Sequence, residues 1–183
     1  MRKATLILDD DTRFCGYSFG AHKCIGGEVV FNTAMTGYTE SLTDPSYAGQ
    51  IMVLTYPLIG NYGVPANDLW DSTQIHAEAL IVSDYSEDYS HWNAKESLGD
   101  WLKREQRPAI TGIDTRALTR LLRERGVMMG RIEIEGVGNT PLNLDYGDIN
   151  YVETVSCQDI IRYNEGAGKR VVIVDCGVKA NII

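Results

Sequence analysis

Short apolar runs alternate with polar segments along the chain, and one long polar segment separates two of these runs. The runs at 29–31 and 51–54 have the length and composition of strands. Residues 32–50 between them are too polar for a core, and connections of this length in compact domains are usually functional or disordered. Apolar anchors within the segment indicate that it is ordered: Met35, Tyr38, Leu42 and Tyr47. We therefore predict an ordered loop, rich in hydroxyl groups, that is suited to bind a small polar ligand or a protein partner.

Further strands are predicted on both sides of this segment. Residues 4–9 and 13–19 have the pattern of an N-terminal hairpin with a polar turn. The apolar runs at 79–82 and 108–110 predict two short strands, and the alternation over 131–135 predicts a half-buried one.

Two helices are predicted from capping residues and apolar spacing. Asn93 and Glu96 have the form of a capping box, so we expect the first helix to begin at Asn93. Its buried stripe at helical spacing would consist of Leu98, Trp101 and Leu102.

The second predicted helix is capped by Asp114 and ends at Gly126. One face carries four apolar residues: Ala117, Leu118, Leu121 and Leu122. The opposite face carries Arg116, Arg120 and Arg123, which we call the arginine row. Such a row is most often a solvated helix face, but arginine is also enriched at the centre of protein interfaces, and both interpretations stay open.

The pattern weakens between residues 136 and 168, and residues 163–168 are typical of a linker. Residues 171–174 then form a continuous apolar run, as in a strand buried on both faces of a parallel sheet. We expect this strand to open a second domain at residue 169, of which the chain contains only the start.

Composition and charge indicate which kinds of partner and which compartment the chain is suited to. The chain has 183 residues, of which 44% are hydrophobic and 23% charged, and its net charge of −8 argues against a general nucleic-acid binder. The segment 103–131 is an exception, because eight basic residues face three acidic ones and give it a charge of +5. No run is long enough for a membrane span, and no signal-peptide pattern opens the sequence. Four scattered cysteines then favour reduced thiols in a cytoplasm.

Motifs for metal or nucleotide chemistry are absent from the sequence. The three histidines lack metal-ligand spacing, so no metal site is expected. No GxxxxGK[ST] motif is present to hold the phosphates of ATP.

Four long motifs resemble the small chain of carbamoyl-phosphate synthase: FNTAMTGYTESLTDPSYAGQI, TYPLIGNYGV, GIDTRALTRLLRERG and VVIVDCGVKANII. The resemblance implies an α/β fold, in which residues 1–168 form a three-layer β/β/α domain with mixed parallel and antiparallel sheets. Residues 169–183 would begin a class I glutamine amidotransferase domain.

The resemblance also implies a reaction. The small chain of this ligase hydrolyses L-glutamine and passes ammonia to a large chain, which makes carbamoyl phosphate from bicarbonate for arginine and pyrimidine synthesis. ATP and magnesium are expected on the large chain of a cytoplasmic heterodimer, and this chain itself is expected to carry no cofactor.

The catalytic cysteine and histidine of the family are expected beyond residue 183, because the family's G-x-C-x-G context does not occur here. Cys176 lies in a superficially similar turn, and we expect it to be a small packing residue. The chain alone is therefore predicted to have no glutaminase activity. The resemblance implies that Ser46, in the T-D-P-S-Y motif, contacts the substrate glutamine. From the residues alone, Ser46 could instead only cap its own turn.

We expect residues 1–168 to dock on the large chain, with the arginine row and Tyr62 as candidate contacts. The alternative is a stand-alone swivelling module that binds a metabolite without catalysis. That module requires a ligand-sized apolar pocket, whereas docking requires an exposed patch of apolar and arginine residues.

Overall fold

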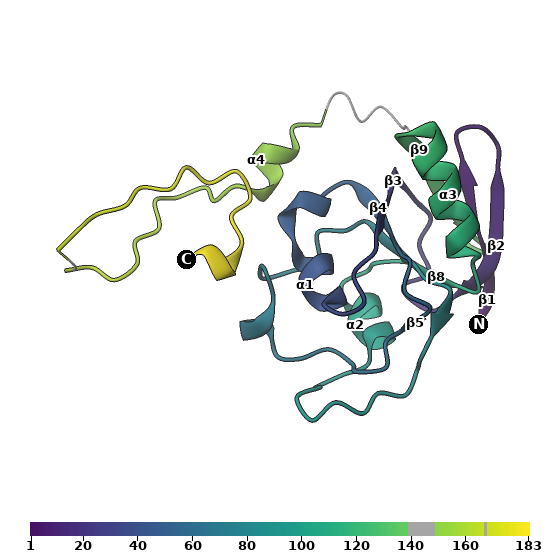
Figure 1. Cartoon of the computed structure of the whole chain (residues 1–183), viewed down its shortest axis with the longest axis horizontal. Coiled ribbons are helices and arrows are strands. Elements are labelled where there is room, and N and C mark those ends of the chain that lie inside the picture. The colour runs from purple at the N-terminus through teal and green to yellow at the C-terminus, as the bar shows by residue number, and fades with distance from the viewer. Residues whose placement is uncertain (139–148, 167) are drawn as a thin grey trace.

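The computed structural model describes residues 1–138, 149–166 and 168–183 (Figure 1). The strands in these ranges are β1 (Arg2–Leu8), β2 (Arg13–Ser18), β3 (Ile25–Asn32), β4 (Gln50–Leu54), β5 (Leu58–Ile59), β6 (Ala79–Ile81), β7 (Asp84–Tyr85), β8 (Ala109–Thr111) and β9 (Met128–Ile134). The α-helices are α1 (Tyr38–Thr43), α2 (Leu98–Arg104), α3 (Thr115–Arg125) and α4 (Tyr151–Val155). Short 3₁₀ helices lie at Pro45–Tyr47, Asn67–Leu69 and Ala180–Ile182.

Seven strands close into a barrel in the order β1-β2-β8-β6-β4-β3-β9. The neighbours β3, β4, β6 and β8 pair in parallel. The remaining pairs, around β1, β2 and β9, are antiparallel. Strands β5 and β7 form a separate parallel pair. The expected α/β class with mixed pairing is therefore confirmed.

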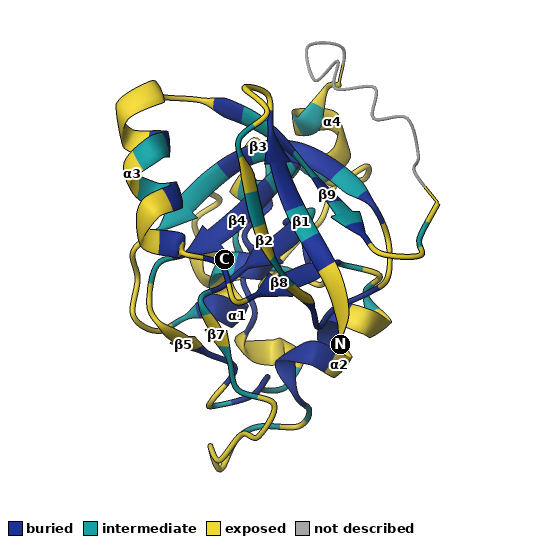
Figure 2. Cartoon of the chain, turned by 90° about the vertical axis from the view of Figure 1, so that its right-hand side faces the viewer, coloured by how far each residue is buried: buried dark blue, intermediate teal, exposed yellow. Residues whose placement is uncertain are grey.

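The barrel interior is filled by side chains from alternate strand positions. On β4, Ile51 and Val53 belong to the interior cluster. Helix α3 joins this cluster through Leu118 and Leu122, and Figure 2 shows its buried face turned toward the barrel. Ala117, which we placed on that face, is exposed instead.

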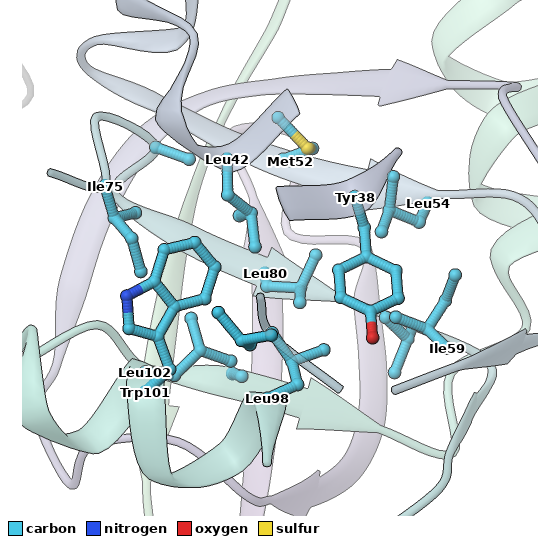
Figure 3. Close-up of a cluster of buried hydrophobic side chains, with 14 of the residues drawn as sticks. Tyr38, Leu42, Met52, Leu54, Ile59, Ile75, Leu80, Leu98, Trp101 and Leu102 are labelled. Carbon is cyan, nitrogen blue, oxygen red and sulfur yellow. The ribbon is translucent and has the colours of Figure 1, made fainter. Parts of the chain in front are cut away.

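A second apolar cluster covers the outer surface of the parallel strands. The intervening β4 residues, Met52 and Leu54, belong to it, together with Leu42 of α1 and Trp101 of α2. Figure 3 shows these side chains packed between the helices and the strands. The two walls of the barrel and this helical layer correspond to the three layers expected from the resemblance.

Most predicted strands are confirmed, but the start of the first predicted helix was wrong. Helix α2 begins at Leu98, and the side chain of Ser97 caps it by accepting the N–H of Asp100 at 3.1 Å. The backbone upstream is already paired: Lys95 donates to the carbonyl of Val64 at 2.8 Å, and Val64 donates to that of Glu96 at 3.0 Å. These bonds hold residues 95–96 extended, so a helix cannot begin at Asn93.

The segment 32–50 is ordered, as predicted, but it is not a loop. It contains α1 and the 3₁₀ helix Pro45–Tyr47. Tyr38 and Leu42 are both buried and stand one helical turn apart, so the residues that we interpreted as loop anchors are the apolar face of a short helix.

Residues 171–174 do not form the predicted strand. Val171 and Val174 are each 84% exposed. A strand buried on both faces needs neighbouring strands, and in the described ranges no strand pairs with these residues. Residues 139–148, within the stretch of weak pattern, lie outside the described residues.

The pairing of β2 with β8 closes the barrel and rests on the pairs Tyr17↔Thr111 and Ser18↔Ile110. A β-carbon on Gly16 would clash with the carbonyl oxygen of Thr111 and lie 2.8 Å from Cγ2 of Ile110. We expect Gly16→Ala to lower the free energy of unfolding by about 1–3 kcal/mol, because the backbone of β2 or β8 must move. Urea unfolding measures this change.

Gly138→Ala is the matched control, since a β-carbon there meets no atom of the described residues within 4 Å. We expect it to change the unfolding free energy by less than about 0.5 kcal/mol. Equal stability of the two variants would show that the β2–β8 contact is not tightly packed.

Candidate functional site

Ser46 lies in the 3₁₀ helix Pro45–Tyr47, between α1 and β4. The carboxylate of Asp44 accepts the backbone N–H of Ser46 at 2.9 Å, and Pro45 follows the cap directly. Asp44 and Pro45 are buried, whereas Ser46 is exposed. The turn therefore holds the Ser46 residue at a fixed position on the surface.

Asp44 also anchors the end of the chain. The Lys179 ammonium lies 2.5 Å from Oδ2 of Asp44 and 3.3 Å from Oδ2 of Asp71. The N–H of Ala180 donates to the carbonyl of Asp71 at 2.7 Å. Both aspartates are buried, and a buried carboxylate needs a partner of opposite charge. Lys179 supplies that charge and joins residues 175–183, here called the C-terminal segment, to the turn of Ser46.

The electrostatics of this cluster agree with its geometry. Burial acts to raise the pKa of Asp44, but hydrogen bonds from Lys179 and from the Ser46 N–H outweigh it, and the pKa is lowered. The same bond to Asp44 raises the pKa of Lys179 above its ordinary value. The ion pair thus stabilises the charged form of both partners.

Asp175 shapes the other end of the C-terminal segment. Its carboxylate accepts the N–H groups of Val178 and Gly177 at 2.8 Å and that of Cys157 at 2.7 Å. These backbone bonds, that of Val178 first, lower the pKa of Asp175 to about 2. The turn brings Gly177 against Pro45, because a β-carbon on Gly177 would lie 3.0 Å from Cβ of Pro45. Cys176 within this turn is exposed, so its predicted role as a packing residue was wrong.

Contacts with residues of this chain fix the side chain of Tyr62 in place. Its hydroxyl accepts the N–H groups of Gly37 at 2.8 Å and Tyr38 at 3.0 Å, and its ring stacks on Tyr38 at 4.1 Å. Burial raises the pKa of both tyrosines. Tyr62 thus fixes the start of α1, and a contact of its ring with a partner stays a prediction.

The arginine row lies on the exposed face of α3, opposite Leu118 and Leu122, as predicted. It does not project from a flat surface. Arg116, Arg120 and Arg123 line one side of a pocket of about 570 Å³, here called the strand-end pocket. Most lining residues are polar or charged by type, but the surface that they present to the pocket is mainly apolar, so the swivelling module is not excluded. The pocket is distinct in position from Ser46 and does not include it.

Two further features of the described residues bear on function. No group of three or more His, Cys, Asp and Glu side chains in this part of the chain could hold a metal ion. No helix of the same residues has the length and apolar character needed to cross a membrane.

The family model for the carbamoyl-phosphate synthase small chain, CPSase domain, matches residues 6–132. The chain belongs to this family. It is 46% identical over 195 residues to the carbamoyl phosphate synthase arginine-specific small chain of Eremothecium gossypii, covering 100% of this chain and 49% of that protein. It is 45% identical over 190 residues to the carbamoyl-phosphate synthase [ammonia], mitochondrial, of Homo sapiens, covering 98% of this chain and 12% of the human protein.

A third similar protein is the multifunctional protein pyr1-3 of Dictyostelium discoideum, at 42% identity over 205 residues, covering 100% of this chain and 9% of that one. The chain thus spans about half the length of the first relative and a much smaller part of the fused ones. The structure supplies the geometry of a small-chain domain, in which Ser46 and the C-terminal segment come together.

Sequence reasoning missed the residues that tie this small-chain domain to the C-terminal segment. Lys179 and Asp71 are 108 positions apart and carry no local motif, so only the fold brings them together. The hydroxyl residues of the strand-end pocket could have been found from their positions in the sequence. Thr33, Thr55 and Ser83 each follow closely on an apolar run of strand length.

The Lys179 ion pair predicts a pH-dependent anchor. We expect Lys179→Met to speed hydrogen exchange of the Ala180 amide at pH 7 by about fivefold, since a partly exposed ion pair contributes about 1 kcal/mol. Because the pKa of Asp44 is lowered on folding, this contribution is present above about pH 4 and is lost as pH falls through the lowered value. NMR measures the exchange rate of the Ala180 amide in the variant and in the unaltered chain. The ratio of these two rates should fall toward one as the solution becomes acidic.

Lys169→Met is the matched control, because Lys169 is exposed and has no ion-pair partner among the described residues. This variant should leave the hydrogen-exchange rate of the Ala180 amide unchanged. An equal effect of the two variants would contradict the anchoring role.

Proposed function

We propose that the chain is the N-terminal part of the glutamine-hydrolysing small subunit of carbamoyl-phosphate synthase. In this role it helps to supply ammonia from L-glutamine for the ATP-dependent synthesis of carbamoyl phosphate from bicarbonate. The observation that carries the proposal is the contact between the turn of Ser46 and the C-terminal segment, through Lys179 and Gly177. The family resemblance assigns the glutamine site to the junction of these two parts.

Ser46 has the chemistry that this assignment needs. A hydroxyl can donate to the carboxylate of glutamine or accept from its ammonium group. The Asp44 cap fixes the backbone of Ser46, and the ion pair with Lys179 holds Asp44 in place. A glutamine bound beside the C-terminal segment would therefore meet a hydroxyl that needs little reordering, which favours binding.

The same domain is proposed to dock on the synthetase chain. The human and Dictyostelium relatives contain the matching region as 12% and 9% of one long polypeptide, which supports a role inside a larger assembly. The arginine row is the preferred contact, because its guanidinium groups are exposed and the rest of the chain is acidic. Tyr62 is a second candidate at the start of α1.

The catalytic cysteine and histidine lie outside this chain in our proposal, so the chain alone hydrolyses no glutamine. ATP and magnesium bind the synthetase chain. The assembled enzyme is a heterodimeric ligase that acts in the cytoplasm and serves arginine synthesis, pyrimidine synthesis or both.

Ser46→Ala in the assembled synthase tests the role of the serine. We expect the KM for glutamine to rise about tenfold, since a lost hydrogen bond to a charged ligand is worth about 1.5 kcal/mol or more. The kcat with saturating glutamine should change little, and synthesis from free ammonia should be unaffected. Steady-state kinetics with each nitrogen source separates these outcomes.

Ser90→Ala serves as the control, because Ser90 is also exposed but lies in the segment before α2. It should leave both activities unchanged. An unchanged KM for glutamine in the Ser46 variant would mean that the serine only caps its own turn.

A further inference from the structure

The four parallel strands of the barrel end at one common edge. The register aligns Asn32 of β3 with Leu54 of β4, and Ile81 of β6 with both Val53 of β4 and Ile110 of β8. Each strand is followed within a few residues by a hydroxyl side chain: Thr33, Thr55, Ser83 and Thr115. All four of these residues line the strand-end pocket. In open parallel sheets the carboxyl ends of the strands are the usual place for a ligand.

Helix α3 follows β8 and lines this pocket. The arginine row lies along it, so the three arginines line the same pocket as the hydroxyl residues. Leu118 and Leu122 fix the helix on the barrel core, which keeps the row in place without any contribution from the arginines. The site therefore combines charged donors on a rigid helix with hydroxyl groups on strand ends.

The positive charge of the pocket is not compensated by the described residues. No carboxylate among them lies within ion-pair distance of Arg116, Arg120 or Arg123. The acidic residue of the lining is Asp114, and its carboxylate already accepts the N–H of Ala117 at 2.9 Å as the cap of α3. The lining thus combines three arginines and one aspartate, a net positive charge, with hydroxyl residues.

We propose that the strand-end pocket binds a small anion that carries a phosphate group. Guanidinium and hydroxyl groups offer donors to the several acceptor oxygens of a phosphate, and arginine matches phosphate geometry through paired N–H bonds. A volume of about 570 Å³ suits a small molecule. This site shares the arginine row with the proposed docking contact, but it needs no partner chain to form.

Isothermal titration calorimetry of this chain with inorganic phosphate and with pyrophosphate tests the proposal, with sodium chloride added to equal ionic strength. We expect both anions to bind, and pyrophosphate more tightly. The variant with Arg116, Arg120 and Arg123 all changed to Ala should lose binding, and Arg120→Ala alone should weaken it about tenfold. The three side chains are exposed, so circular dichroism should show an unchanged fold.

Arg125→Ala is the matched control, because Arg125 lies on the last turn of the same helix but does not line the pocket. It should bind both anions as the unchanged chain does. Equal binding by the triple variant, an equal loss in the control, or binding of acetate as tight as that of phosphate would each overturn the proposal. The titration contains no synthetase chain, so its failure leaves the proposed docking role untouched.

Discussion

Parallel pairing of β3, β4, β6 and β8 is the constraint on which the rest of this structure depends. Parallel neighbours cannot be joined by a tight turn, so each connection must cross back over the sheet. The crossover from β3 to β4 carries α1 and Ser46, the next carries Asp71, and the one from β6 to β8 carries α2. These crossovers cover the outer face of the strands and bury the cluster around Trp101. Packing of that face therefore decides where the polar residues of the crossovers lie.

The same constraint separates the two edges that carry the proposed roles. Ser46 precedes the first residue of β4 by four positions, whereas Thr55 follows its last residue directly. The proposed glutamine contact thus belongs to the amino end of the parallel strands, and the strand-end pocket belongs to their carboxyl end. Figure 1 shows the C-terminal segment and α3 on different sides of the barrel, in agreement with this division. One domain therefore holds the C-terminal segment at one edge and presents its basic helix at the other.

The sequence predicts the strands and α3 well, because their signals are local. The 131–135 alternation, the Asp114 cap and Gly126 with its positive φ of 86° each act within a few residues. The sequence does not predict α1, the start of α2 or the conformation of residues 171–174, because these features depend on residues that are distant in the sequence. Val64 holds residues 95–96 extended, and Lys179 reaches two aspartates that only the fold makes neighbours. Ser46 and the arginine row could be named from sequence, whereas the pocket beside the row required the strand register.

The proposed docking of this domain on the synthetase chain, through the exposed face of α3, is best tested by calorimetric titration of this chain into that chain. We expect binding that weakens at least tenfold when Arg116, Arg120 and Arg123 are all changed to Ala, and that is unchanged in Arg125→Ala. Binding that is equally strong in the triple variant, or no binding of the unaltered chain, would contradict it.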